Sequence, residues 1–204
     1  MCGIGGVFIK NGGHPHQTAL DKMRAALNFR GPDGHGIYSD KSVGFVHTRL
    51  SIIDSAGGHQ PMIDTKGRAL VFNGEIYNYL EIRQSLKDSY DFKTKSDTET
   101  ILALYDAYGL DFVNHLRGMY AIALYDPIKD LMVIARDPFG IKPLYITDMP
   151  SHMAFASEPK ALIHSGYASD TLDIPMLRSV VKQNYIGGLD TPYPAIQRLQ
   201  AGEK

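Results

Sequence analysis

Runs of apolar residues, some alternating with polar positions and some continuous, predict a chain of short strands and helices. Strands are expected over residues 4–9, 36–39, 43–50, 69–72, 119–125, 131–135, 144–147 and 153–157. Apolar positions three and four residues apart predict helices over residues 17–29, about 78–86, 96–109, 110–116 and 175–183. Hairpin connections join several neighbouring strands, which favours antiparallel sheets covered by helices over a parallel βαβ arrangement.

Two local signals mark the ends of these elements. Asn73-Gly74 follows the apolar run at 69–72, and since this pair typically forms a turn, the strand is expected to end there. Ser96 stands at the start of a helical pattern with Glu99 three residues later. This spacing predicts a capping box, in which each side chain bonds the backbone of the other residue.

The end of the chain carries no clear pattern. Residues 187–204 are rich in Pro and Gly and predict no regular element. We therefore expect residues 1–190 to form one domain. Residues 191–204 are expected to be its edge, or a linker toward a further domain.

Composition and charge narrow the class of protein. The chain is 44% hydrophobic and 21% charged with a formal net charge of −1, which predicts neither a nucleic-acid nor an anionic-membrane partner. No apolar run approaches the ~20 residues of a membrane span, and the first ten residues do not resemble a secretory signal. A single cysteine excludes an internal disulfide and a thiol-rich zinc site. We expect a cytoplasmic protein without a metal site.

The position of the only cysteine suggests chemistry. Cys2 directly follows Met1 and begins an apolar segment. Once Met1 is removed, Cys2 carries a free α-amine beside its own thiol, with ordinary pKa values of ~7.7–8.0 and ~8.5. An amine that titrates near neutral pH is a suitable general base, so nucleophile and base can belong to one residue. The alternative, a cysteine that serves as a small apolar residue, stays open at this point.

Other polar residues fit the binding of an amino acid and an acyl-transfer reaction. Asn73 offers an amide donor and Gly74 a backbone N–H to a tetrahedral oxyanion, with the anion of Glu75 nearby. Arg49, within an apolar strand, can grip a carboxylate with two donors, and Asp97 can bind an ammonium group. The ordinary alternatives are a turn at Asn73-Gly74, an ion pair at Arg49 and a helix cap at Asp97.

Six stretches resemble, in order, the glutaminase domain of asparagine synthetase, a class II glutamine amidotransferase of the N-terminal-nucleophile hydrolase group. They cover about the whole chain and comprise MCGI at 1–4, RGPD at 30–33, RLSIID at 49–54, NGEIYN at 73–78, SDTE at 96–99 and RDPFGIKPLY at 136–145. The resemblance implies an α+β fold, a four-layer αββα sandwich of two mainly antiparallel sheets.

The resemblance also implies roles for individual residues. Cys2 attacks the side-chain amide carbon of glutamine, ammonia leaves, and water cleaves the resulting glutamyl thioester. Asn73 and Gly74 form the oxyanion hole. Arg49 binds the α-carboxylate with help from backbone groups through Ile53. The implied substrate-binding residues are Arg49, Leu50, Ser51, Ile52, Ile53, Asn73, Gly74, Glu75 and Asp97, the last two acids binding the α-ammonium.

The implied partners are L-glutamine and a synthetase domain, in the same chain or in a partner subunit. That domain makes asparagine from aspartate with ATP and Mg²⁺, whereas the glutaminase half needs no cofactor. A homodimer is compatible with the resemblance. Two alternatives remain open: a stand-alone N-terminal-nucleophile hydrolase of another acylamide, and a non-catalytic glutamine-sensing domain with an inert Cys2.

Overall fold

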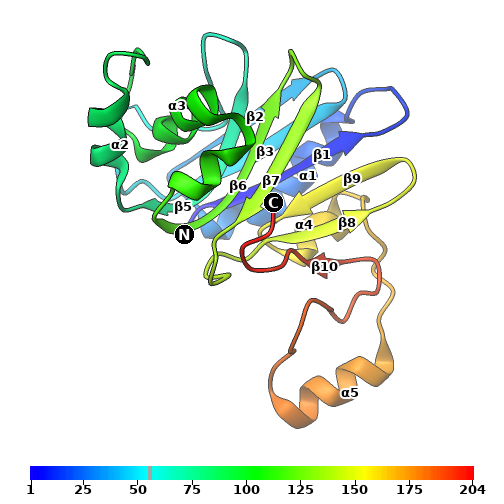
Figure 1. Ribbon diagram of the computed structural model, residues 1–204. Helices are drawn as coiled ribbons and strands as arrows, with labels where there is room; N and C mark the ends of the chain where they lie inside the picture. Colours follow the sequence, from blue (N-terminus) through cyan, green and yellow to red (C-terminus); the bar gives the residue numbers. More distant parts are fainter. Residues whose placement is uncertain (55–56) are drawn as a thin grey trace.

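The computed structural model describes residues 1–54 and 57–204, and its centre is a pair of antiparallel sheets (Figure 1). The first sheet has six strands in the order β10-β8-β9-β1-β3-β2. The bounds are β1 (Gly3–Ile9), β2 (Gly34–Asp40), β3 (Val43–Arg49), β8 (Tyr145–Asp148), β9 (His152–Ala156) and β10 (Gln197–Arg198). Because β1 pairs with β3 on one side and β9 on the other, the N-terminus is tied to the interior of this sheet.

The second sheet has four strands in the order β4-β5-β6-β7. Their bounds are β4 (Met62–Ile63), β5 (Ala69–Ile76), β6 (Gly118–Asp126) and β7 (Leu131–Arg136). The expected turn at Asn73-Gly74 is wrong, because β5 continues through both residues and pairs with β6 along its whole length. A Cβ on Gly74 would lie 2.1 Å from the Met119 carbonyl oxygen, so glycine serves close approach of two strands here.

Helices cover the outer face of each sheet (Figure 1). The bounds are α1 (Gln17–Leu27), α2 (Tyr79–Leu86), α3 (Asp97–Tyr108), α4 (Pro159–His164) and α5 (Ile174–Gln183), with 3₁₀ helices η1 (Asn28–Arg30) and η2 (Gly109–His115). One apolar cluster joins α1 and α4 to the first sheet, a second fills the space between the sheets, and a third joins α2 and α3 to the second sheet. The expected four-layer αββα sandwich is confirmed.

Local details differ from the sequence patterns. Ser96 caps α3 by accepting a bond from the Thr98 N–H at 3.2 Å. The carboxylate of Glu99 accepts bonds from the N–H groups of Lys93 and Thr94, each at 2.7 Å. Ser96 is therefore the N-cap, but the expected reciprocal capping box with Glu99 does not form. The helix expected over residues 110–116 is the 3₁₀ helix η2. The short elements β4, α4 and β10 carry too few residues for a periodic signal.

The C-terminal segment packs on the first sheet. β10 pairs with β8, and Ile196 and Leu199 are buried on either side of it. The sequence predicted no regular element over 187–204, and this prediction is wrong. Between α4 and β10 the chain leaves the sandwich and forms α5, none of whose residues is buried (Figure 1). The domain boundary at residue 190 stays a prediction. No helix in the described ranges is long and apolar enough to cross a bilayer.

Candidate active site

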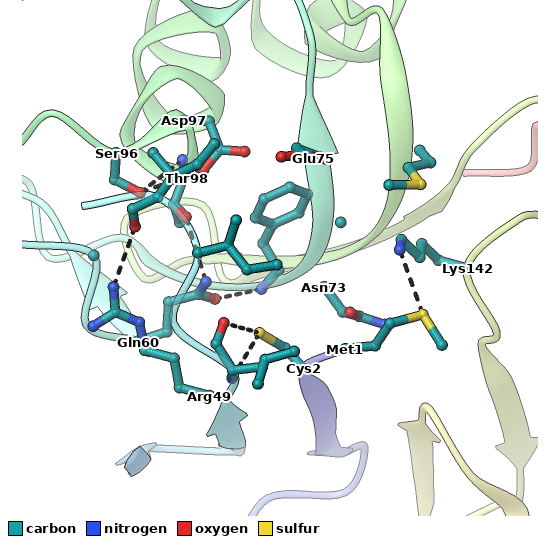
Figure 2. A pocket seen from close by; sticks show the side chains of 17 residues that line it. Met1, Cys2, Arg49, Gln60, Asn73, Glu75, Ser96, Asp97, Thr98 and Lys142 are labelled. Carbon is teal, nitrogen blue, oxygen red and sulfur yellow. Dashed lines mark hydrogen bonds between the residues drawn. The ribbon is translucent and has the colours of Figure 1, made fainter. Parts of the chain in front are cut away.

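A cavity of about 220 Å³ opens where the start of β1, the end of β3, β5 and the start of α3 meet (Figure 2). It gathers nearly every residue that the sequence marked. Its lining comprises Met1, Cys2, Arg49, Leu50, Ile52, Ile53, Gly58, Gln60, Phe72, Asn73, Gly74, Glu75, Ser96, Asp97, Thr98, Met119 and Lys142. Ser51 is the expected site residue that does not line it. Its N–H donates to the Asp33 carboxylate at 2.8 Å.

The thiol of Cys2 is held against the backbone of Leu50. The Leu50 N–H donates to Sγ at 3.4 Å, and the thiol donates to the Leu50 carbonyl at 3.6 Å. On the other side, Arg30 Nε donates to the Cys2 carbonyl at 3.1 Å, and its guanidinium pairs with Glu158. These contacts fix both the backbone and the side chain of Cys2 at the edge of the cavity.

The side-chain amide of Asn73 is an unused hydrogen-bond donor at the cavity. Asn73 is 1% exposed, and across residues 1–54 and 57–204 its Nδ2 finds no acceptor. A buried polar atom without a partner costs about 1–3 kcal/mol, so such atoms are rare and call for a reason. An amide N–H that lines the same cavity as the thiol is suited to receive an oxyanion.

A second donor comes from the free edge of β5. The N–H groups of Phe72 and Ile76 point away from β6, since they donate to Gln60 Oε1 at 2.6 Å and to Asp97 Oδ2 at 3.1 Å. N–H groups two residues apart in a strand point to the same edge. The N–H of Gly74 therefore points to this edge as well, toward the cavity that Gly74 lines.

Arg49 is held by the loop that follows it. Its Nη2 donates to the carbonyls of Asp54 at 2.6 Å and Ile53 at 3.3 Å. The Asp54 carboxylate in turn accepts the N–H groups of Lys95 at 2.8 Å and Gly57 at 2.9 Å, and these bonds lower the pKa of Asp54. A guanidinium presents its five donors in a fixed fork that matches the two oxygens of a carboxylate, so Arg49 has the geometry for binding one.

Two acids face the cavity from neighbouring elements. Asp97 is the first residue of α3 and 5% exposed, and Glu75 belongs to β5. Burial raises the pKa of Asp97, the N–H groups of Ile76 and Thr98 oppose this, and the Glu75 carboxylate adds to it. Two carboxylates in one small cavity form a site for a cation.

We predict that Asp97→Asn gives a protein of equal or higher stability that binds glutamine, the substrate implied by the resemblance, poorly. The pKa of Asp97 is raised above its ordinary 3.8, so its contribution to stability is fully present below that pH. This contribution is lost as the pH rises through the folded-state value. At neutral pH the charged form thus lowers the free energy of unfolding, and asparagine removes that cost. Losing one partner of a buried ammonium–carboxylate pair costs ~2 kcal/mol or more, or at least ~30-fold in KM.

Thermal unfolding between pH 4 and pH 7 and the KM for glutamine check this prediction. Asp88→Asn is the matched control, because Asp88 is exposed in the loop after α2. A KM that stays at the wild-type value in Asp97→Asn would remove Asp97 from the substrate site. A Tm that falls more at pH 7 than at pH 4 would contradict the stability argument.

Several cavity residues carry no chemical signal in the sequence. Gln60 lies in the loop before β4 and is recognisable only through its bonds to Phe72 and Thr98. Lys142 lies within the quoted stretch 136–145, which marked the region but not the residue. Its Nζ donates to Met1 Sδ at 3.5 Å.

In the described part of the chain, no three His, Cys, Asp or Glu residues gather as a metal site.

Comparison with known proteins agrees with this geometry. The model of the glutamine amidotransferase domain matches residues 1–204. The chain belongs to the glutamine amidotransferase family. Asparagine synthetase [glutamine-hydrolyzing] 1 of Bacillus subtilis is 44% identical over 171 residues, which cover 80% of this chain and 27% of the relative. Amidase chry2 of Gibberella zeae is 39% identical over 217 residues, which cover 99% of this chain and 32% of the relative.

This glutamine amidotransferase domain spans less than a third of the length of these two relatives. The resemblance to the glutaminase domain of asparagine synthetases is confirmed. A solved structure of Bacillus subtilis glutamine phosphoribosylpyrophosphate amidotransferase, complexed with ADP and GMP, superposes with a TM-score of 0.65 at 23% identity. The superposition covers 81% of this chain and 44% of the chain in the solved structure. The shared fold is therefore that of the N-terminal-nucleophile amidotransferases.

Proposed function

We propose that this domain hydrolyses the side-chain amide of L-glutamine through Cys2 and supplies the ammonia to a synthetase domain. The observation that carries the proposal is the unused, buried amide donor of Asn73 in the same cavity as the only thiol. A donor that is satisfied only when a carbonyl oxygen enters suits a site in which negative charge develops on that oxygen.

The reaction then follows from the groups present. After Met1 is removed, the α-amine of Cys2 takes the thiol proton, and Sγ bonds to the amide carbon of glutamine. Asn73 Nδ2–H and the Gly74 N–H donate to the oxygen that becomes negative. The carbon–nitrogen bond breaks, the amine returns its proton to the leaving ammonia, and a glutamyl thioester remains. Water attacks this thioester, the carbon–sulfur bond breaks, and glutamate leaves with the thiol restored.

The charges of the cavity support a free amino acid as substrate. Arg49 supplies donors for the α-carboxylate, and Asp97 with Glu75 supplies the counter-charge for the α-ammonium. The volume of about 220 Å³ is below the ~300–1,000 Å³ of common ligand pockets, which suits a single small molecule. Leu50, Ile52 and Ile53 are proposed to enclose the substrate from the loop after β3, while Ser51 orients that loop through Asp33.

The fate of the ammonia is proposed from the relatives. The Bacillus subtilis relative is named a glutamine-hydrolysing asparagine synthetase, and the domain matches about a quarter of it. We therefore propose a synthetase domain, in the same chain or in a partner subunit, that uses ATP and Mg²⁺ to form asparagine from aspartate. A cytoplasmic location and a homodimer belong to the same proposal.

A second candidate function is hydrolysis of another acylamide. The match to a protein named amidase, which covers 99% of this chain, favours keeping it. The same nucleophile and oxyanion donors serve either reaction, since both pass through a tetrahedral intermediate. The two functions differ in the need for the α-amino and α-carboxylate groups of the substrate.

We predict that Asn73→Ala lowers kcat for glutamine hydrolysis by ~10²–10³ with little change in KM, because the lost bond forms mainly in the transition state. Glutamate release is measured on protein whose intact mass shows removal of Met1. Asn114→Ala is the matched control, since Asn114 is exposed in η2.

An unchanged kcat in Asn73→Ala would contradict the oxyanion role. Release of ammonia from other acylamides by a protein that leaves glutamine intact would support the second candidate. Glutamine binding without any turnover by the processed protein would support the sensing domain in place of both enzymes.

A further inference from the structure

A buried cation without a catalytic assignment lies beside the nucleophile. Lys142 is 6% exposed and lines the same cavity as Cys2. Figure 2 shows Met1 between Cys2 and the Lys142 side chain, with Arg49 on the opposite side of Cys2. The Nζ of Lys142 donates to Met1 Sδ at 3.5 Å. A thioether is a weak acceptor, so this contact does little to stabilise a buried ammonium group.

The ammonium group of Lys142 forms no ion pair with the described residues. Among the residues that the structure describes, no carboxylate oxygen lies within 4.0 Å of its Nζ. Burial lowers the pKa of Lys142, and Arg30 lowers it further, whereas Glu75, Cys2 and Asp137 raise it. Of these three groups, Glu75 and Cys2 line the cavity.

Asp137 is engaged elsewhere, although it is next to this lysine in space. One oxygen of its carboxylate accepts the N–H groups of Phe139 at 3.1 Å and Ile141 at 3.0 Å. The other accepts those of Tyr120 at 3.3 Å and Lys142 at 3.0 Å. A carboxylate with four backbone donors is already stabilised and serves to shape the turn.

The backbone that carries Lys142 is held rigidly. The guanidinium of Arg136 donates to the carbonyl oxygens of Lys142 at 2.7 Å, Gly140 at 2.7 Å and Leu199 at 2.6 Å. Together with Asp137, these bonds fix the turn from 136 to 142 against β6 and the C-terminal segment. The direction of the Lys142 side chain into the cavity is therefore part of the fold, and a functional group needs such a support.

We propose that Lys142 is a positioning residue whose buried ammonium keeps the α-amine of the mature Cys2 neutral, so that this amine can accept the thiol proton. The inference rests on the proposed function, since it assigns a role within the same reaction. Removal of Met1 exposes the amine on the side of Cys2 that faces Lys142 (Figure 2).

The physical argument is one of like charges. An α-amine has an ordinary pKa of ~7.7–8.0, so at neutral pH most of it is protonated and cannot act as a base. A second cation in a partly buried site disfavours protonation of the amine and favours the thiolate. Before substrate binds, the Glu75 carboxylate has the opposite effect, because a nearby negative charge favours the protonated amine. Arg30, which bonds the Cys2 carbonyl, is already paired with Glu158. Once glutamine is bound, its α-ammonium pairs with Glu75 and its α-carboxylate with Arg49, and Lys142 remains as a cation of the cavity without a carboxylate partner among the described residues.

The test compares Lys142→Met, which removes the charge at similar length, with Lys142→Arg, which keeps it. Lys87→Met is the control, because Lys87 is exposed after α2. Two pH profiles are recorded on protein that has lost Met1. The first is kcat/KM for glutamine hydrolysis. The second is the rate at which iodoacetamide alkylates Cys2, followed by intact mass, which is unambiguous because the chain has one cysteine.

We expect Lys142→Met to move the acid limb of both profiles upward by about one pH unit. The rate at pH 7 then falls about 10-fold and recovers toward wild type at high pH, while Lys142→Arg and Lys87→Met follow wild type. An unshifted acid limb in Lys142→Met, or a loss of the same factor at every pH, would overturn the proposal. A Lys142→Arg variant with the same shifted profiles as Lys142→Met would also overturn the proposal.

The experiment separates failure of this inference from failure of the proposed function. If the wild-type protein releases no glutamate from glutamine, the proposed function fails, while the alkylation profile still tests the effect of Lys142 on Cys2. Thermal unfolding verifies that the variants fold, and Lys142→Gln provides a second uncharged side chain if methionine disturbs the cavity.

Discussion

Replacing Cys2 with alanine is expected to lower kcat for glutamine hydrolysis by at least ~10⁴-fold, since the thioester cannot form without the nucleophile. The chain has no other cysteine to replace it. Binding of glutamine should change little, because the groups proposed to bind the charged ends of the substrate belong to Arg49, Glu75 and Asp97, which line the cavity. The variant therefore separates chemistry from recognition.

Alanine is also the suitable replacement on structural grounds. Within residues 1–54 and 57–204, the thiol bonds only the backbone of Leu50, at 3.4 and 3.6 Å, so its loss leaves the fold of the site in place. Alanine is small, so removal of Met1 is expected to proceed as in the wild type. Glutamate release is measured together with glutamine binding by calorimetry. Turnover within 100-fold of wild type would show that Cys2 is not the nucleophile.

Much of this site was recognisable from the sequence because its residues carry their chemistry in local patterns. Cys2 stands at the chain terminus, and Arg49 interrupts an apolar strand. Each pattern alone also fitted a purely structural role, and only the order of the patterns along the chain indicated a family. The structure adds that these positions, from residue 2 to residue 97, line one cavity.

Other features depend on contacts that no local pattern contains. Asn73-Gly74 has the composition of a turn, yet pairing with β6 keeps both residues in a strand, so tertiary structure overrides local preference. The Phe72 N–H donates to Gln60 in a neighbouring loop, and the contact between Lys142 and Met1 joins residues 141 positions apart in the sequence. Strands of two residues such as β4 and β10 exist only because a longer neighbour offers an edge.

Retention of Met1 is expected to slow glutamine hydrolysis by ~10²–10⁴-fold, the usual contribution of a general base. With Met1 attached, the nitrogen of Cys2 is a peptide nitrogen and cannot accept the thiol proton. Met1 also lines the cavity and contacts Lys142, so it occupies space beside the nucleophile. Both effects act in the same direction, and both end when the peptide bond before Cys2 is cut.

One preparation can provide both states. An N-terminal extension that ends in a protease site directly before Cys2 blocks the amine, and cleavage then leaves Cys2 as the first residue. Rates before and after cleavage, with intact mass as the measure of processing, should rise in proportion to the cleaved fraction. Cys2→Ala treated in the same way controls for contaminating activity. Full activity before cleavage would mean that a group other than the α-amine takes the proton, and the mechanism would have to be assigned to another base.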